Sequence, residues 1–419
     1  MGREILAGAT TFLTMSYIVV VNPAILSTTG TGMPFSGALT ATVLVCFLGT
    51  LLMGLYAKLP FGVAPGMGLN AFFAYTLVIN GRVAWPVALG IVFWAGVLFL
   101  VVSATPLRER IAMAIPRTLR DAAAAGIGLL LAFIGLQNAG FVAANPATMV
   151  GVGSIDHRAL LALAGLFICV WLSRNNNPFA YLTSIALVTL AAWIGGWVDP
   201  PSSWVSAPDF SSVFLKLDVW GALQWSLAAA MVTVLMTCLF DSLSTFIGVA
   251  HAANLLEANG EPKNLRRGLI VDAVAIVASA LVGSSPGTAY AESIAGIRMG
   301  GRTGLTSVAT AFCFLPCLFI APTAAAIPNY ATAPVLILVG VAMFQTVTRI
   351  PFGELHLAVP AFTTIVLIPL TFSITQGILW GLVLHAVLHA VTGRARELSG
   401  AAWGLATVSV ALLVLEHVH

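Results

Sequence analysis

The chain has 419 residues, of which 59% are hydrophobic and only 8% carry a charged side chain. Soluble domains contain about a quarter charged residues, so this composition excludes an ordinary soluble enzyme and indicates a membrane protein with many spans. The formal net charge is only +3 and the basic residues are scattered, which argues against a nucleic-acid partner. No A-x-A cleavage pattern follows the first apolar stretch, so we expect no cleaved signal peptide.

Apolar segments of membrane length recur along the whole chain. A hydrocarbon core about 30 Å thick needs about 20 apolar helical residues. Stretches that fit this criterion lie at 6–27, 35–58, 84–105, 118–138, 157–175, 178–198, 219–250, 268–282, 302–321, 333–348, 355–374 and 375–391. Two further apolar stretches, 62–80 and 284–298, are interrupted by Pro-Gly and are too short to cross as plain helices. Counting both as broken spans predicts fourteen crossings.

The distribution of basic residues supports this count. If the N-terminus is cytoplasmic, 15 of the 18 Lys and Arg residues fall in inner loops, and only Arg82, Arg158 and Lys216 fall outside. The pattern holds only when both broken stretches count as full crossings. We therefore predict a multi-pass protein of the bacterial inner (plasma) membrane with both termini in the cytoplasm. The apolar tail 394–419 is predicted to be an interfacial helix, with a short extra crossing as the alternative.

The two broken stretches form an internal repeat. Each is the third span of its half, and aligning Pro65-Gly66 with Pro286-Gly287 gives an offset of 221 residues, close to half the chain. Seven spans per half is an odd number, so the halves must have opposite orientations. Paired Pro/Gly-interrupted segments in an inverted repeat indicate the central site of a transporter.

Lipid cannot satisfy the hydrogen-bonding groups of an unwound backbone, so both breaks are predicted to meet inside the protein. Helices restarting near Leu69 and Ala291 would direct their N-terminal amides into one cavity. Pro65 and Pro286 have no N–H to leave unpaired, and Gly66 and Gly287 allow a ligand to approach the main chain. The alternative is two ordinary loops in which Gly and Pro form turns.

Two carboxylates, Asp241 and Glu292, lie at membrane depth. A carboxylate there costs at least about 2.5–3.5 kcal/mol on the insertion scale and usually faces a functional interior. The alternatives are a structural hydrogen bond for Asp241 and a helix N-cap for Glu292. Asp272, close in sequence to Arg266 and Arg267, is interpreted as a structural pair or an early helix charge.

Other chemistry-bearing residues give weaker signals. The cysteines lie in apolar runs without a C-x-x-C pair, so we interpret them as packing residues. His385 and His389 are too few ligands for a metal site and are interpreted as part of a solvated helix face. No phosphate-binding G-x-x-x-x-G-K-[ST] motif occurs, which disfavours ATP-driven transport. The sequence shows no catalytic Ser/His pair and no H-E-x-x-H motif, so no motif in it indicates an enzyme.

Five segments carry a resemblance to a known family. They are residues 8–23 (GATTFLTMSYIVVVNP), 64–75 (APGMGLNAFFAY), 240–245 (FDSLST), 261–264 (EPKN) and 285–296 (SPGTAYAESIAG). In order and over nearly the whole chain, they closely resemble the AzgA-like adenine/guanine/hypoxanthine permeases, which belong to the nucleobase–cation symporter group that includes uracil and xanthine permeases. One departure is Ser242-Leu-Ser244, where the family more often has Ser-x-Gly.

The resemblance implies an all-α fold of fourteen spans in a seven-plus-seven inverted repeat, with short β-strands in the third and tenth spans. Spans 1–4 and 8–11 would form a core domain, at residues 1–105 and 219–322. Spans 5–7 and 12–14 would form a gate domain, at 106–218 and 323–393. The family imports purine bases with protons, and its key positions fall on Asn70, Asp241 and Glu292.

On this basis we expect proton-coupled purine import by movement of the core against the gate, with no cofactor besides the coupling proton. Glu292 would accept hydrogen bonds from the purine, Asn70 would read a substituent edge, and Asp241 would carry the coupling proton together with Glu292. The remaining expected substrate contacts are amide donors at Tyr290–Ala291 and Ala71–Phe73, stacking rings at Phe72, Phe73, Phe240 and Tyr290, and Thr288. The expected partners are membrane lipid and a second copy bound through the gate domain. The rivals are a sulfate-permease-like anion transporter, a xanthine/uracil permease, a channel and a membrane enzyme.

Overall fold

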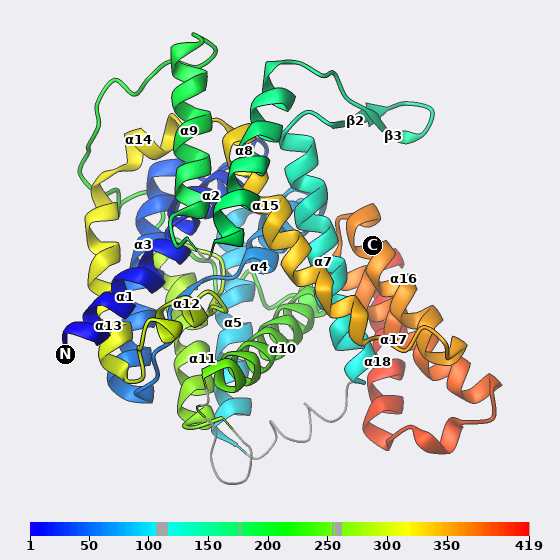
Figure 1. The fold of residues 1–419 in the computed structure, drawn as a ribbon. Coiled ribbons are helices and arrows are strands. Elements are labelled where there is room, and N and C mark those ends of the chain that lie inside the picture. The colour runs from blue at the N-terminus through cyan, green and yellow to red at the C-terminus, as the bar shows by residue number, and fades with distance from the viewer. Residues whose placement is uncertain (106–115, 176, 254, 256–261, 419) are drawn as a thin grey trace.

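Helices dominate the computed structural model, which describes residues 1–105, 116–175, 177–253, 255 and 262–418 (Figure 1). Arg108 and Arg110, which the orientation count placed in an inner loop, and Glu261 of the EPKN segment lie outside the described residues.

The first half of the chain contains a broken first span, a strand in its third span and a hairpin after its fifth. Its elements are α1 (Gly2–Met15), α2 (Ile18–Leu26), α3 (Phe35–Leu52) with a π-helical end (Met53–Ala57), β1 (Val63–Pro65), α4 (Met67–Ala71) continued by a π-helix (Phe72–Asn80), α5 (Trp85–Ala104), α7 (Arg117–Asn138), β2 (Val142–Asn145), β3 (Met149–Val152), α8 (His157–Arg174) and α9 (Ala180–Ile194).

The second half repeats this order, again with a strand in its third span. Its elements are a 3-10 turn (Trp225–Leu227), α10 (Ala228–Ala253), α11 (Leu265–Val282), β4 (Gly287–Ala289), α12 (Ser293–Arg298), α13 (Gly304–Phe314) with a 3-10 end (Leu315–Phe319), α14 (Ala321–Ala325), α15 (Asn329–Phe344) with a 3-10 end (Gln345–Arg349), α16 (Leu355–Thr371), α17 (Ile374–Val391), a 3-10 turn (Ala395–Glu397) and α18 (Gly400–Val418). Up to α17, the described elements group into fourteen successive spans, which confirms the predicted fold class.

Only some of these spans have the length and apolar composition of ordinary membrane helices. Within the described residues, eight helices are long and apolar enough to cross a membrane on length and composition alone. The others are shorter, as α9 and α16 are, or are interrupted by a strand. The helix α11 carries Arg266, Arg267 and Asp272. Hydropathy alone therefore undercounts the spans of this fold.

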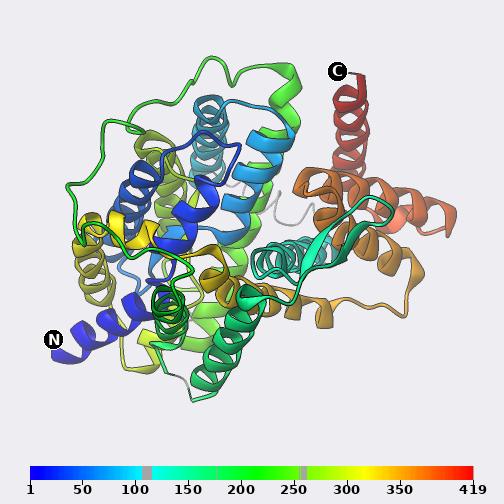
Figure 2. The ribbon, with the colours of Figure 1, turned by 90° about the horizontal axis from the view of Figure 1, so that it is seen from above.

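The helices pack in two groups, which Figure 2 shows from above. In one group α7 packs against α15 and α16, α8 packs against α9 and α15, and α16 packs against α17. In the other group α11 packs against α5 and α3, and α1 packs against α13. These groups correspond to a gate and a core domain; the residue boundaries given above stay a prediction.

The structure differs from the sequence prediction in two spans. The first span is not one helix, because a turn at Ser16–Tyr17 separates α1 from α2. Residues 219–224 were predicted to begin the eighth span, but the helical structure begins only at Trp225. The apolar residues before it, Val219, Ala222 and Leu223, belong to the preceding turn region, so apolarity alone misplaced this helix start.

A β-hairpin between α7 and α8 was not predicted. Strands β2 and β3 pair antiparallel, with Asn145 opposite Met149. The Asn145 carboxamide oxygen accepts hydrogen bonds from the backbone N–H groups of Ala147 and Thr148, and Met149 has a φ of 65°. An Asn side chain that bonds the backbone two residues on is a turn signal, and it identifies this hairpin in retrospect.

The C-terminal tail forms the helix α18, which packs against α17 and α10. Leu412 and Leu413 of α18 are buried with Ala229 of α10 and Leu379 of α17. Whether α18 lies in the interface or crosses the membrane stays a prediction.

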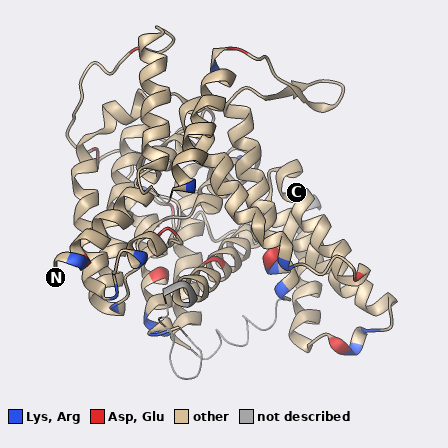
Figure 3. Ribbon diagram, viewed as in Figure 1, with Lys and Arg blue, Asp and Glu red and all other residues tan. Residues whose placement is uncertain are grey.

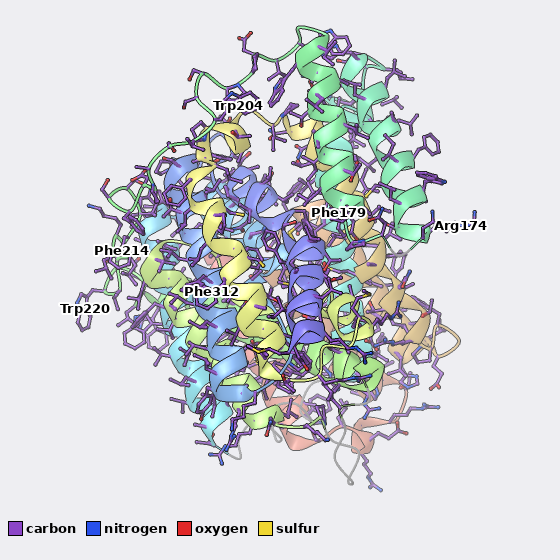
Figure 4. All side chains as sticks on the ribbon, turned by 60° about the vertical axis from the view of Figure 1, so that its left-hand side comes forward. Arg174, Phe179, Trp204, Phe214, Trp220 and Phe312 are labelled. Atoms are coloured by element: carbon purple, nitrogen blue, oxygen red, sulfur yellow. The ribbon has the colours of Figure 1, made fainter. Side chains whose placement is uncertain are left out.

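Large apolar side chains cover the outer surface. Four of the aromatic residues labelled in Figure 4, Phe179, Phe214, Trp220 and Phe312, are all exposed, and of these Phe312 lies within a helix, α13. Trp220 is 80% exposed and Phe312 is 55% exposed. Soluble monomers rarely expose such large apolar surfaces, so lipid is the natural environment of this face. In Figure 3 most of the Lys and Arg positions, coloured blue on the ribbon, lie toward the lower end of the molecule.

Candidate functional site: the crossing of the two broken spans

The strands of the third and tenth spans pair with each other at the centre of the core. β1 and β4 run antiparallel, with Ala64 opposite Thr288. Two more backbone bonds extend the pairing, from the Gly66 N–H to the Pro286 oxygen and from the Tyr290 N–H to the Gly62 oxygen, each 2.9 Å long. The predicted meeting of the two breaks inside the protein is confirmed.

The register corrects the predicted repeat alignment. Ala64 and Thr288 are the middle residues of their strands, so equivalent positions lie 224 residues apart rather than 221. Pro65 ends β1, whereas Pro286 precedes β4, where its carbonyl oxygen accepts a hydrogen bond from Gly66. Proline lacks an N–H and is tolerated at either end of a strand. Matching the two prolines therefore gave the wrong alignment.

Side chains satisfy backbone groups on the outer edges of the two strands. The Thr50 hydroxyl accepts from the Val63 N–H at 2.9 Å and donates to the Val63 oxygen at 3.0 Å. On the other strand, the Gly287 N–H donates to Ser279 Oγ at 3.0 Å, and the Ala289 N–H donates to Asp272 Oδ2 at 3.2 Å. Short strands deep in a membrane protein need such partners because neither lipid nor bulk water can supply them.

This arrangement changes the interpretation of Asp272. Asp272 was interpreted as a structural pair or an early helix charge. The Arg266 guanidinium donates instead to the Ala104 oxygen, and Asp272 lies beyond the first turn of α11. Asp272 is fully buried on α11 and holds the backbone of β4. It is a third carboxylate at the site, and it accepts a hydrogen bond from the backbone of β4.

The half-helices begin at Met67 and Ser293, two residues from the predicted starts. The first-turn amides, which have no partner inside the helix, are therefore at Met67–Leu69 rather than Ala71–Phe73. The Phe72 N–H bonds to Gly68 and Leu69 carbonyls, and the Tyr290 N–H is used by Gly62. The predicted donors at Phe72 and Tyr290 were thus wrong, and those at Ala71 and Phe73 stay a prediction. Ala291 is exposed beside the start of α12.

Glu292 lies immediately before α12 and is partly exposed. Its side chain does not cap the helix; Oε1 accepts a hydrogen bond of 2.8 Å from the Tyr17 hydroxyl. Tyr17 occupies the break between α1 and α2, and its ring contacts Tyr181 of the gate helix α9 edge-on, with centroids 5.0 Å apart. Glu292 is therefore connected through one phenol to the opposite domain.

Asp241 lies on α10 beside the tenth span. Its Oδ2 accepts a hydrogen bond of 3.1 Å from the Thr288 hydroxyl, and its side chain is partly exposed. The adjacent Phe240 faces the gate domain, where the Arg120 guanidinium lies 5.8 Å from its ring centroid. Phe240 and Arg120 also line a small cavity between α10 and the gate helices α7, α16 and α17.

Asn70 has a different environment, inside a buried amide network. Its Nδ2 donates to Asn22 Oδ1 at 3.0 Å, and the Ser285 hydroxyl donates to the same oxygen at 3.1 Å. Asn22 Nδ2 in turn donates to the Thr42 hydroxyl at 2.7 Å. The Asn70 Oδ1 atom has no hydrogen-bond partner among the described residues.

The aromatic candidates are divided between the site and the packed interior. Phe72 and Phe73 are each 1% exposed and belong to the main hydrophobic cluster. Tyr290 is 6% exposed, and its hydroxyl donates to the Pro65 oxygen. The structure gathers Asp241, Thr288, Ala291 and Glu292 at the tenth span; the individual roles in substrate binding stay predictions.

Two residues that hold this site, Tyr17 and Asn22, were not predicted from the sequence. Asn22 had a signal, because Asn-Pro in the middle of an apolar run frees backbone groups that need partners. Tyr17 had a weaker signal as a phenol at membrane depth, where a buried hydroxyl needs a hydrogen-bond partner.

Two half-helices that start at a shared centre, beside the carboxylates of Asp241, Asp272 and Glu292, define the class of secondary transporters with broken helices. The chain belongs to a family of such membrane proteins, described simply as the permease family, whose model matches residues 2–380. The resemblance noted in the sequence is thereby confirmed.

Two relatives with assigned substrates align over nearly the whole chain. The adenine permease AdeP of Escherichia coli is 40% identical over 397 residues, which cover 94% of this chain and 89% of the relative. The guanine/hypoxanthine permease PbuO of Bacillus subtilis is 39% identical over 405 residues, covering 94% and 93%.

A solved structure shares the fold at lower sequence identity. The transmembrane domain of the cyanobacterial bicarbonate transporter BicA superposes with a TM-score of 0.69 at 20% identity, covering 91% of this chain and 97% of that one. The likeness establishes the architecture and leaves the substrate open, since the two relatives above are named for purines and this neighbour is named for an anion.

Proposed function

We propose that this protein transports purine nucleobases across the bacterial inner membrane, coupled to protons, by movement of the core domain against the gate. The named relatives that support a purine substrate include adenine and guanine/hypoxanthine permeases. The observation that carries the proposal is the partly exposed Glu292 carboxylate at the start of α12, held by Tyr17 beside the crossing of β1 and β4.

The chemistry of the site suits a purine edge. A purine offers N–H donors and N or O acceptors on a flat ring. Glu292 accepts from the ring N–H groups, and the exposed backbone near Ala291 offers donors from the positive end of a half-helix. Tyr17 then either keeps its bond to Glu292 or turns toward the base, since its hydroxyl both donates and accepts.

Proton coupling is assigned to Asp241 and Glu292, with no other cofactor. Asp241 is joined to β4 through Thr288, and Glu292 follows the same strand. Because both carboxylates are connected to β4, a change of charge on one of them affects the strand to which the other is also connected. Affinity for the base then depends on proton occupancy, which is what coupling requires.

Orientation and assembly belong to the same proposal. The distribution of the basic residues supports a cytoplasmic position for both termini, and a second copy would bind through the gate domain. An anion substrate is the rival that the shared fold with a bicarbonate transporter raises. The carboxylates at the centre oppose it, because an anion prefers a positive site.

The test is uptake of radiolabelled adenine, guanine, hypoxanthine, xanthine, uracil and bicarbonate by cells that lack their own permeases. We expect purine uptake that depends on the proton gradient. Asp241→Asn should retain exchange of labelled for unlabelled purine while losing gradient-driven accumulation. Asp199→Asn, in the exposed outer loop, is the matched control. Absence of purine uptake, or accumulation by Asp241→Asn at the control rate, contradicts the proposal.

A further inference from the structure

Three histidines gather at one end of the gate domain, away from the crossing of the broken spans. His356 is near the start of α16, and His385 and His389 lie in the last two turns of α17. The ring centroids of His356 and His389 are 4.8 Å apart, and those of His385 and His389 are 4.1 Å apart. The sequence interpretation of a solvated helix face is wrong, since these side chains are only 4–7% exposed.

The cluster also includes an acidic residue, Glu397. Ligand atoms of His356, His389 and Glu397 all lie within 4.8 Å of one another. Glu397 belongs to the 3-10 turn that leads from α17 to α18, and its side chain is 60% exposed. The three residues therefore come from the beginning of one span, the end of the next and the segment that follows.

The hydrogen bonding prepares His389 as a ligand. Its Nδ1 lies 2.8 Å from the His385 carbonyl oxygen, which can only accept, so Nδ1 carries the hydrogen. The lone pair is thereby left on Nε2. A ligand histidine whose other ring N–H is bound to a backbone carbonyl is the usual arrangement in metal sites, where it fixes the ring and its tautomer.

A second, independent observation concerns the ring of His385. His385 is only 4% exposed, yet its Nδ1 atom has no hydrogen-bond partner among the described residues. Buried polar atoms are nearly always satisfied. His385 thus offers an unused nitrogen beside the ring of His389.

We propose that His356, His389 and Glu397 bind a divalent transition metal of the zinc type, with His385 as the fourth ligand or as the group that orients His389. Two or three imidazoles with one carboxylate form a donor set that Zn²⁺ accepts. Zinc–ligand bonds of about 2.0–2.2 Å bring ligand atoms closer than they lie here, so binding draws the exposed Glu397 inward.

Arg394 is the competitor of the metal. Its NH1 lies 3.1 Å from His356 Nε2 and 3.4 Å from Glu354 Oε2, and its Nε lies 4.0 Å from Glu397 Oε1. The guanidinium therefore supplies the positive charge that the metal would supply. Glu354 also lies 3.5 Å from His356, so it can hold the displaced Arg394 or serve as a further carboxylate. Removing the guanidinium should strengthen metal binding.

The experiment uses the full-length chain in detergent micelles, purified with an affinity tag free of histidine. Zn²⁺, Co²⁺ and Mg²⁺ are titrated by calorimetry, and bound metal is counted after dialysis. We expect one Zn²⁺ or Co²⁺ per chain and no Mg²⁺. His389→Gln and Glu397→Gln should each weaken zinc binding by about tenfold or more, the scale set by loss of groups around metal sites. Arg394→Gln should tighten it.

His157→Gln is the matched control, because His157 is the first residue of α8 and its ring contacts Trp197 and Tyr330 rather than the three histidines. It should bind zinc like the parent. Glu397→Gln changes an exposed side chain, so it tests the ligand set even if the buried variants fail to fold. Absence of saturable zinc binding, or affinities of His389→Gln and Glu397→Gln equal to that of the control, would overturn the proposal. None of these outcomes depends on which substrate is transported.

Discussion

The third and tenth spans share a backbone design and differ in chemistry. Each contributes a three-residue strand followed by a short helix, and the strands pair with one another. In the third span the polar residue is Asn70, a neutral amide with no exposed surface. In the tenth span it is Glu292, a carboxylate that is partly exposed. The repeat is symmetric in its main chain and asymmetric in its charge.

This difference separates two tasks. The third span binds Asn22, which in turn binds Thr42, so its polar groups join the first two spans to the crossing. The carboxylate of the tenth span is partly exposed. It accepts a hydrogen bond from Tyr17, whose ring contacts Tyr181 of the gate domain. One half of the repeat holds the centre together, and the other presents a group for a ligand.

The largest effect is expected from removing the charge of the tenth span. Glu292→Gln keeps the shape but replaces a charged acceptor, and hydrogen bonds to charged groups contribute about 1.5–3 kcal/mol. Purine uptake should fall by about 10- to 100-fold, with the protein still folded by size-exclusion chromatography. In contrast, Asn70→Ala should mainly lower the melting temperature. Equal loss of uptake at unchanged stability in both variants would remove the proposed division of tasks.

The next effect concerns how the third span meets the gate. A Cβ atom at Gly68 would lie 2.4 Å from Cγ2 of Ile127 on α7. Overpacking of this kind costs about 1–3 kcal/mol, so Gly68→Val should lower the uptake rate about tenfold while purine binding changes little. Adding Ile127→Ala makes room and should restore much of the rate. If the double variant transports no better than Gly68→Val, the contact does not limit movement.

A smaller effect is expected at the phenol that links Glu292 to the gate. Tyr17→Phe removes the 2.8 Å hydrogen bond and retains the ring contact with Tyr181. The KM for purine should change by up to about tenfold, since one hydrogen bond to a carboxylate is lost. Tyr56→Phe, at an exposed position on the end of the second span, serves as the control. A KM equal to that of the control would show that the bond has no part in binding.

The smallest effect is expected from a substitution in the outer loop between α9 and α10, which connects the two halves. Asp209 accepts hydrogen bonds from Ser212 and from Ser36 of α3, and these bonds hold the pKa of its carboxyl below the ordinary value. A lowered pKa stabilises the fold above the unfolded-state pKa, and this stability is lost as the pH falls through the folded-state pKa. Asp209→Asn should lower the melting temperature slightly at neutral pH.

The pH dependence distinguishes this role from simple packing. The difference between Asp209→Asn and the parent should shrink as the pH falls below the ordinary Asp pKa of about 3.9. It should vanish below the lowered folded-state pKa, where the folded parent carboxyl is protonated as well. Asp199→Asn, exposed in the same loop, should show no difference at either pH. A melting difference that persists unchanged in acid would contradict the electrostatic explanation.

Local patterns were sufficient to predict much of this molecule. The Pro-Gly interruptions predicted both broken spans, and the odd number of spans per half predicted the inverted repeat, because these features depend on residues close in sequence. Asp241 and Glu292 were identified because a carboxylate is costly at membrane depth. The family resemblance added the strands.

Contacts between distant segments could not be predicted in the same way. Tyr17 binds Glu292 across 275 positions, and nothing near Tyr17 in the sequence indicates that partner. The strand register depended on which backbone groups found side-chain partners at Thr50, Ser279 and Asp272. His356 is far in sequence from His389, so sequence spacing brought together only His385 and His389, two of the three histidines in the cluster.

The pairing of β1 with β4 also sets an order of events during synthesis. The Pro65 carbonyl accepts from Tyr290, which the ribosome adds 225 residues later. At about 5–20 residues per second, the first strand waits roughly 10 to 45 seconds before its partner exists. By then nine spans have been synthesised, and the edge of β1 among them is still unpaired. The centre of the protein is therefore completed late, and a chain that stops after its first half retains an open strand where the transport site should be.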